Sequence, residues 1–294
     1  MRKIASSSIF AIFFYLIGAL AMCTANATTK YISVNNILTT SEIVMMKSLL
    51  SVLLLLPFNC KYVIDAEPRK KIRDNILLLL AIGFATLISQ FTWINAIQRI
   101  PLNNVFLCIM IISPIMTAIG GRIVFKENIS NRIKCAFAVN IFAIFLINKF
   151  VVNKIDWSIG YLFLLCDLLV YSIIILITRK LRELPSGLIV FVRFLVVLPL
   201  SIIAVRHFPT LTFAVVFFAL IVAVASTMGR FFQTKSYKYL EVSIVQPLRY
   251  FDIVFTMFIS FLILGEKPAL YQILGAIIII ASGFIVASEK NRVN

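Results

Sequence analysis

The sequence is short of histidine and of acidic residues, and these shortages exclude several kinds of protein. His207 is the only histidine, so neither a multi-histidine metal site nor a nucleophile–histidine pair can form. The five cysteines are scattered without a Cys-x-x-Cys spacing, which is typical of small reduced core residues. A glycine-rich phosphate-binding loop is also missing. We therefore expect no enzyme, no metal and no cofactor.

Charged residues are scarce as well, at 14% of the 294 residues, whereas 61% are hydrophobic. Soluble domains carry roughly 25% charged and about 45–50% apolar residues. A globule of this size cannot bury so much apolar surface, and the mean hydropathy of +1.02 points the same way. The excess must face lipid, which excludes a soluble enzyme, a nucleic-acid-binding domain and a disordered chain.

The net charge of +16 comes from 28 basic and 12 acidic residues. In a soluble protein it would suggest a polyanion site, but most basic residues here lie in short gaps between apolar runs. This pattern favours a topology signal, because positive loops stay in the cytoplasm. With a cytoplasmic N-terminus, eighteen basic residues fall inside and six outside. We expect both termini in the cytoplasm and no nucleic-acid partner.

Ten apolar runs are long enough to cross the hydrocarbon core of a bilayer, which needs about 20 residues. They are continuous rather than alternating, and this favours helices over a barrel. Pro101 separates the third run from the fourth, because proline disfavours helix in the residue before it. The predicted spans are 4–24, 37–58, 75–97, 102–121, 132–148, 157–178, 187–206, 210–230, 242–264 and 268–288.

Two copies of a five-helix unit are predicted from internal similarity. Segment 95–149 resembles 234–288 at an offset of 139, and Lys47 matches Arg193 at an offset of 146. Chance similarity between Ile- and Leu-rich helices is the alternative, but basic residues and glutamates match too. We divide the chain at 1–149 and 150–294. Because five is odd, the second copy is inverted, which places a site at the repeat interface near mid-membrane.

Five ionisable residues lie at predicted membrane depth, where a charge costs roughly 2.5–3.5 kcal/mol. They must pair, contact water or lose their charge. Arg249 and Asp252 are three residues apart and could form a structural pair on one helix face. Lys47 and Arg193 could be folding or topology features of both repeats, and Asp167 has no cation within one turn. The alternative is that all five line a polar cavity that binds substrate.

Such a cavity suits a zwitterionic amino-acid end, with cations for its carboxylate and acids for its ammonium. Burial disfavours a charged carboxyl group, so Asp167 or Asp252 could also carry a proton. A soft cation is attracted by aromatic faces. The aromatic and amide candidates are Trp93, Tyr171, Tyr250, Asn26 and Gln246, with Gln90 and Gln233 as further amides. Packing between helices is the alternative for each. Arg230 lies near a predicted helix end, and we expect it to reach the cytoplasmic interface.

Each half has a lysine or arginine in its second helix and a link like Gly265-Glu266 before its last helix. In this pattern the chain resembles the EamA-type branch of the drug/metabolite transporter superfamily. A narrower resemblance rests on Ala25-Asn26, Thr29-Lys30-Tyr31 and Pro247 to Asp252. These segments are similar to the S-adenosylmethionine uptake carriers of obligate intracellular bacteria, although Ala27 and Leu248 depart from that group.

The resemblance implies a secondary transporter of the bacterial inner membrane, working by alternating access, with S-adenosylmethionine uptake as the first substrate hypothesis. Two alternatives remain open. One is an exporter of amino acids, other metabolites or drugs, and the other is a membrane scaffold that transports nothing. The expected partners are a small-molecule substrate and the lipid bilayer, and the oligomeric state is undetermined.

Overall fold

The computed structural model is all-helical in the residues that it describes, which are 2–64, 66–100, 102–126, 130–147, 159–240, 245, 248–264 and 269–289. This confirms the predicted all-α class. The first half contains α1 (Arg2–Val34), α2 (Thr40–Ile64), α3 (Ala66–Asp74), α4 (Ile76–Arg99), α5 (Leu102–Phe125) and α6 (Asn131–Ile147). The second half contains α7 (Ile159–Lys180), α8 (Ser186–Ala204), α9 (Phe213–Tyr239), α11 (Phe251–Leu264) and α12 (Leu270–Glu289).

Each predicted run overlaps one helix, and six of the described helices are long and apolar enough to cross a membrane. Shorter apolar stretches lie in α5, α6 and α12. Large apolar side chains such as Leu77, Ile203 and Phe213 are exposed, as lipid-facing residues would be. The structure thus establishes several apolar helices, and the count of ten complete spans remains a prediction.

Three helix boundaries differ from the predicted ones by nine or ten residues. α1 continues to Val34 rather than 24, and α9 continues to Tyr239 rather than 230. The hydropathy falls at these points because polar side chains such as Asn26 and Gln233 face a cavity, while the backbone remains helical. α11 begins at Phe251, later than the predicted 242, because residues 249 and 250 form a turn. The basic helix α3 was not predicted.

Local sequence explains where individual helices begin. The Thr39 backbone N–H and hydroxyl donate to Glu42 Oε2 at 2.6 and 2.8 Å, and the Glu42 N–H donates to Thr39 Oγ1 at 3.4 Å. This is a capping box, which satisfies backbone donors at the start of α2. Thr212 caps α9 by accepting from the Val215 N–H at 3.3 Å.

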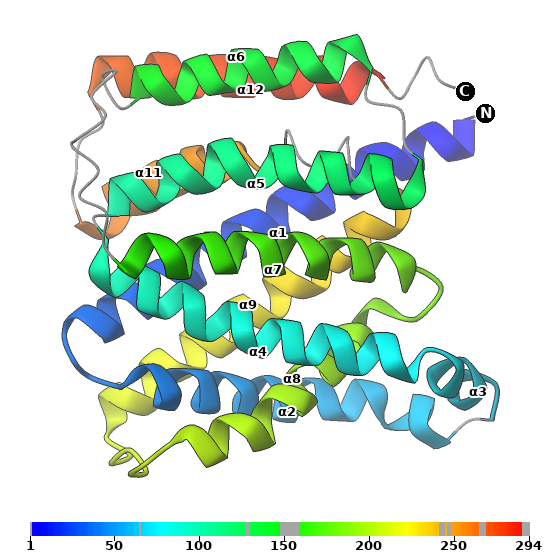
Figure 1. Ribbon diagram of the computed structural model, residues 1–294, viewed down its shortest axis with the longest axis vertical. Helices are drawn as coiled ribbons and strands as arrows, with labels where there is room; N and C mark the ends of the chain where they lie inside the picture. Colours follow the sequence, from blue (N-terminus) through cyan, green and yellow to red (C-terminus); the bar gives the residue numbers. More distant parts are fainter. Residues whose placement is uncertain are drawn as a thin grey trace.

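Helix packing between the two halves is reciprocal (Figure 1). α1 packs on α9 and α4 packs on α7, whereas α2 packs on α8 and α6 on α12. The counterparts in the two halves are α1 and α7, α2 and α8, α4 and α9, and α6 and α12. Exchanging each helix for its counterpart returns the same four contacts, as in a twofold-symmetric interface. α1 and α7 run in opposite directions in Figure 1, as do α2 and α8. The start of α1 and the end of α12 lie at the same end of the helices.

Candidate functional site

A polar cavity lies between the two halves, with an empty volume of about 930 Å³ that includes the part open to solvent. Helices α1, α2, α4 and α5 contribute to its wall from the first half, and α7, α9 and α11 from the second. Its polar and charged lining residues are Asn26, Thr29, Lys47, Ser89, Gln90, Asp167, Ser226, Arg230, Gln233, Arg249 and Asp252. The two repeats therefore share one chamber.

Two carboxyl groups face this chamber from different helices. Asp167 is buried on α7, and its Oδ1 accepts a hydrogen bond of 2.6 Å from Ser89 on α4. Arg249 and Arg230 attract it electrostatically. Asp252, at the start of α11, has a buried Oδ1 without a hydrogen-bond partner among the described residues. One acid is thus held in place across the two halves, and the other has a free acceptor.

Three cations line the same chamber, namely Lys47, Arg230 and Arg249. The Arg249 guanidinium donates to the Ser113 hydroxyl and lies 4.8 Å from the centre of the Tyr171 ring. Arg249 also attracts Asp252 electrostatically, in addition to its contacts with a hydroxyl and an aromatic ring. With all groups ionised, three cations against two acids leave the chamber positive.

Neutral groups complete the wall. Both amide atoms of the buried Gln90 and the Nε1 of Trp93 are without hydrogen-bond partners among the described residues. A buried polar group without a hydrogen bond costs free energy. Several such groups at one cavity therefore indicate that a polar ligand or water forms hydrogen bonds with them there. Asn26 and Tyr171 also line the chamber, as expected for cavity residues.

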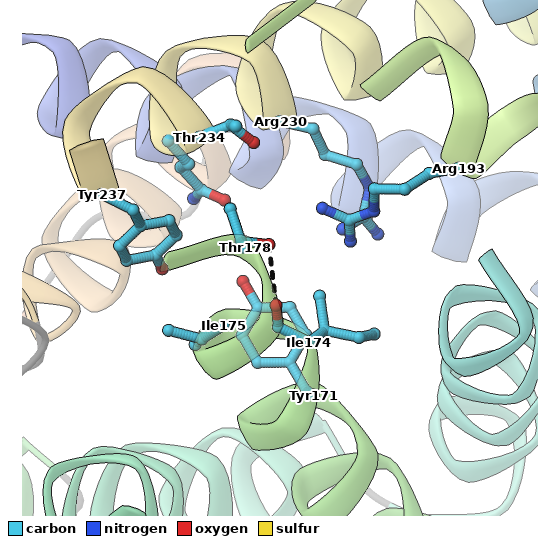
Figure 2. A pocket seen from close by; sticks show the side chains of 9 residues that line it. Tyr171, Ile174, Ile175, Thr178, Arg193, Arg230, Thr234 and Tyr237 are labelled. Atoms are coloured by element: carbon cyan, nitrogen blue, oxygen red, sulfur yellow. Dashed lines mark hydrogen bonds between the residues drawn. The ribbon is translucent and has the colours of Figure 1, made fainter. Parts of the chain in front are cut away.

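A second, smaller cavity adjoins the first and shares Tyr171, Arg230 and Gln233 with it. Arg193 lies in this smaller cavity, where its Nε donates to Thr86 Oγ1 at 3.0 Å. Figure 2 shows the side chains of Arg193 and Arg230 converging on it from α8 and α9. Arg193 and Lys47, equivalent in sequence, therefore line different cavities.

One predicted site residue in the described part of the chain, Tyr250, does not line either cavity. Tyr250 is fully buried in a cluster with Ala143, Ile144, Ile253 and Ile279, because it lies in the turn before α11 and packs against α6 and α12. Gln246 lies outside the described residues.

The expectation for Arg230 was wrong. Its side chain is only 8% exposed and lines both cavities, since α9 continues for more than two turns beyond it. Sequence reasoning also missed Ser89 and Ser226. The available signal was a small polar residue within an apolar run. Serine in such a run is equally typical of packing between membrane helices, so it does not by itself indicate a cavity.

Metal binding finds no support in the part of the chain that is described, where no group of three or more His, Cys, Asp or Glu residues could hold an ion. The site consists of charges of both signs, amides and aromatic rings. Such a set can hold a polar or zwitterionic molecule by hydrogen bonds and electrostatics.

Apolar helices in two similar halves around a charged internal chamber define a multi-pass membrane transporter. The chain belongs to the EamA-like transporter family, whose model matches it twice, over residues 9–149 and 158–288. The family is one of transporters, and no catalytic family is indicated. This confirms the two repeats. The ends of the two matches differ by the predicted offset of 139.

A solved structure described only as "Crystal structure of protein" has the same fold. It covers 97% of this chain and 99% of its own, with a TM-score of 0.71 and 12% sequence identity. At that identity the likeness shows the fold alone. None of the curated proteins compared with the chain matches it.

Proposed function

We propose that the chain is a secondary transporter that takes up a small metabolite with an amino-acid end across the bacterial inner membrane, both termini being cytoplasmic. The observation that carries the proposal is the presence of two acids and three cations around one chamber between the repeats. S-adenosylmethionine is the first substrate to test, because the resemblance of the segments around Asn26 and Asp252 suggested it.

The roles we assign follow from the available atoms. Asp252, with its unpartnered Oδ1, binds the substrate ammonium group, and Lys47 on α2 binds the carboxylate. Asp167 on α7 provides a second acid from the same repeat as Asp252. Trp93 supplies an aromatic face for a sulfonium or other soft cation, since Arg249 already covers the Tyr171 ring.

Alternating access follows from the reciprocal packing. Helices of both halves line the chamber, so a rocking motion of one half against the other would open it to either face. Binding free energy would come from hydrogen bonds between the substrate and the buried polar groups that have no partner in the protein.

Counterflow uptake into proteoliposomes tests the proposal. The panel contains zwitterionic amino acids, S-adenosylmethionine, dicarboxylates and a neutral sugar. We expect saturable uptake of at least one molecule with an amino-acid end, and loss of about tenfold or more in Asp167→Asn and Asp252→Asn, from the lost charge-assisted hydrogen bonds. The exposed Asp74→Asn at the end of α3 is the matched control and should transport normally.

Wild-type uptake by both acid variants would remove these carboxyl groups from the mechanism. If no panel member is transported in either direction, and if cysteines at 167, 249 and 252 resist a membrane-impermeant thiol reagent, the scaffold alternative holds. Transport seen only when substrate is loaded on the cytoplasmic side would establish an exporter in place of an uptake carrier.

A further inference from the structure

Part of the chamber wall combines apolar side chains with a single amide group. Trp93 of α4 belongs to an apolar cluster with Ile109 of α5 and Leu168 of α7, and all three line the chamber. Gln90 also lines it and precedes Trp93 by three residues, so the two side chains share one face of α4. In ligand pockets, apolar walls supply most of the contact area, and a few polar groups fix the orientation of the ligand.

The Gln90 side chain is buried with all of its hydrogen-bonding capacity unused. It is only 3% exposed, and neither Nε2 nor Oε1 has a hydrogen-bond partner in the part of the chain that is described. Nε2 carries two donor hydrogens and Oε1 is an acceptor. The Trp93 Nε1 in the same wall has no acceptor either. Leaving such groups unpaired costs free energy, which a partner would recover.

The adjacent hydroxyl groups of α4 do not provide that partner. Ser89 donates to Asp167 Oδ1 at 2.6 Å, and Thr92 donates to the Ile88 carbonyl at 2.8 Å. They are one and two positions from Gln90, where side chains on a helix do not face each other. Because the chamber is the space that Gln90 lines, its partner has to come from there.

We infer that Gln90 binds a planar edge of the ligand in which a hydrogen-bond donor lies beside an acceptor. A primary amide has such an edge, and so has the side of adenine that carries the amino group. Oε1 accepts from the ligand's donor and Nε2 donates to its acceptor, as glutamine does with adenine in DNA recognition. The Trp93 N–H adds a further donor.

The Gln90 subsite rests on the proposed function, because it holds the part of the substrate that lies beyond the amino-acid end. The chamber, with its empty volume of about 930 Å³ including the open part, has the size of a small-molecule pocket. Gln90 therefore selects among substrates that share the amino-acid end and differ in the rest of the molecule.

Equilibrium binding of radiolabelled glutamine, norleucine and adenine to the purified full chain in detergent tests the subsite. Norleucine has a side chain of similar length without a polar edge. We expect glutamine to bind about tenfold more tightly than norleucine, and Gln90→Leu to remove that preference and to weaken adenine binding about tenfold. Gln98→Leu is the matched control, since Gln98 is an exposed glutamine of the same helix that bonds to Ser33 at 2.6 Å. It should keep both properties.

A second variant gives a readout that a packing role would not move. Gln90→Glu keeps the size of the side chain but offers acceptors only, whereas the guanidinium group of arginine offers donors only. We expect the affinity for arginine relative to glutamine to rise about tenfold in this variant. An unchanged ratio in the folded protein would contradict the subsite.

The probes also separate this inference from the proposed function. Glutamine binding that depends on Gln90 identifies an amide ligand, and adenine binding that depends on Gln90 identifies a purine. If amino acids bind but neither glutamine nor adenine depends on Gln90, the subsite is overturned and the amino-acid site stands. If adenine alone binds and depends on Gln90, the subsite stands and the amino-acid site is removed. Absence of binding of every probe would overturn both.

Discussion

At the scale of single residues, burial separates the cavity side chains from residues of the same type elsewhere. Arg230 and Arg99 are both arginines near the end of an apolar run, yet the first is buried and the second exposed. Tyr171 and Tyr250 differ in the opposite sense, since the half-buried Tyr171 lines the chamber and the fully buried Tyr250 packs among aliphatic residues. Residue type is the same in each pair, so the surrounding structure distinguishes the two members.

The Ser89 hydroxyl should stabilise the folded protein through Asp167. Ser89→Ala leaves a buried carboxylate oxygen without its donor, which costs about 1–3 kcal/mol. We expect a lower unfolding temperature for the purified protein. In an Asp167→Asn background the same change should cost less, because the pair no longer includes a charge, and equal costs in both backgrounds would show that Ser89 does not act through Asp167.

At the scale of helices, close approach of small residues determines which helices can cross. A Cβ on Gly18 of α1 would lie 2.9 Å from the Gly229 carbonyl oxygen on α9, and one on Gly229 would lie 3.0 Å from the Gly18 carbonyl oxygen. Backbone atoms cannot move aside as a side chain can. The crossing therefore requires glycine on both helices, as small residues permit in membrane helix packing.

Gly18→Ala should destabilise the protein by about 1–3 kcal/mol, because the added methyl group forces α1 and α9 apart. The thermal unfolding transition in detergent measures this. Gly187→Ala is the matched control, since its Cβ would meet nothing closer than Asn59 Oδ1 at 3.5 Å and should leave the transition unchanged. Equal effects of the two substitutions would mean that the α1–α9 crossing does not limit stability.

At the scale of the whole molecule, the reciprocal packing puts corresponding segments of the two halves at opposite ends. α3 follows α2 at one end of the helices, and the segment between α8 and α9 lies at the other (Figure 1). The two segments occupy equivalent positions in the repeats. An inverted arrangement in the membrane therefore exposes them to opposite faces.

Single cysteines at Arg73→Cys and His207→Cys, in a background without native cysteines, test this arrangement. We expect a membrane-impermeant thiol reagent applied to intact cells to label position 207 and to reach position 73 only after permeabilisation, given the excess of basic residues around α3. Both side chains are exposed. Labelling of both positions from one face would mean that the repeats are parallel.

Much of the architecture could be predicted from sequence, because hydropathy and repeat spacing are properties of consecutive residues. The apolar runs predicted the helices, and matching residues at offsets near 139 and 146 predicted two repeats. For the site, a charge in lipid is costly wherever it lies, so ionisable residues within apolar runs are candidates for a polar cavity. Four of these candidates line the chamber, namely Asp167, Asp252, Lys47 and Arg249.

The sequence by itself determined that this chain is a helical membrane protein in two halves, since hydropathy and charge are properties of the residues alone. Only the tertiary structure decided that Ser89 holds Asp167, that Arg230 faces inward and that Tyr250 does not reach the chamber. The physical reason is that a polar side chain on a membrane helix gains its partner from another helix. Which helix that is depends on packing between segments more than seventy residues apart, such as the 78 residues between Ser89 and Asp167.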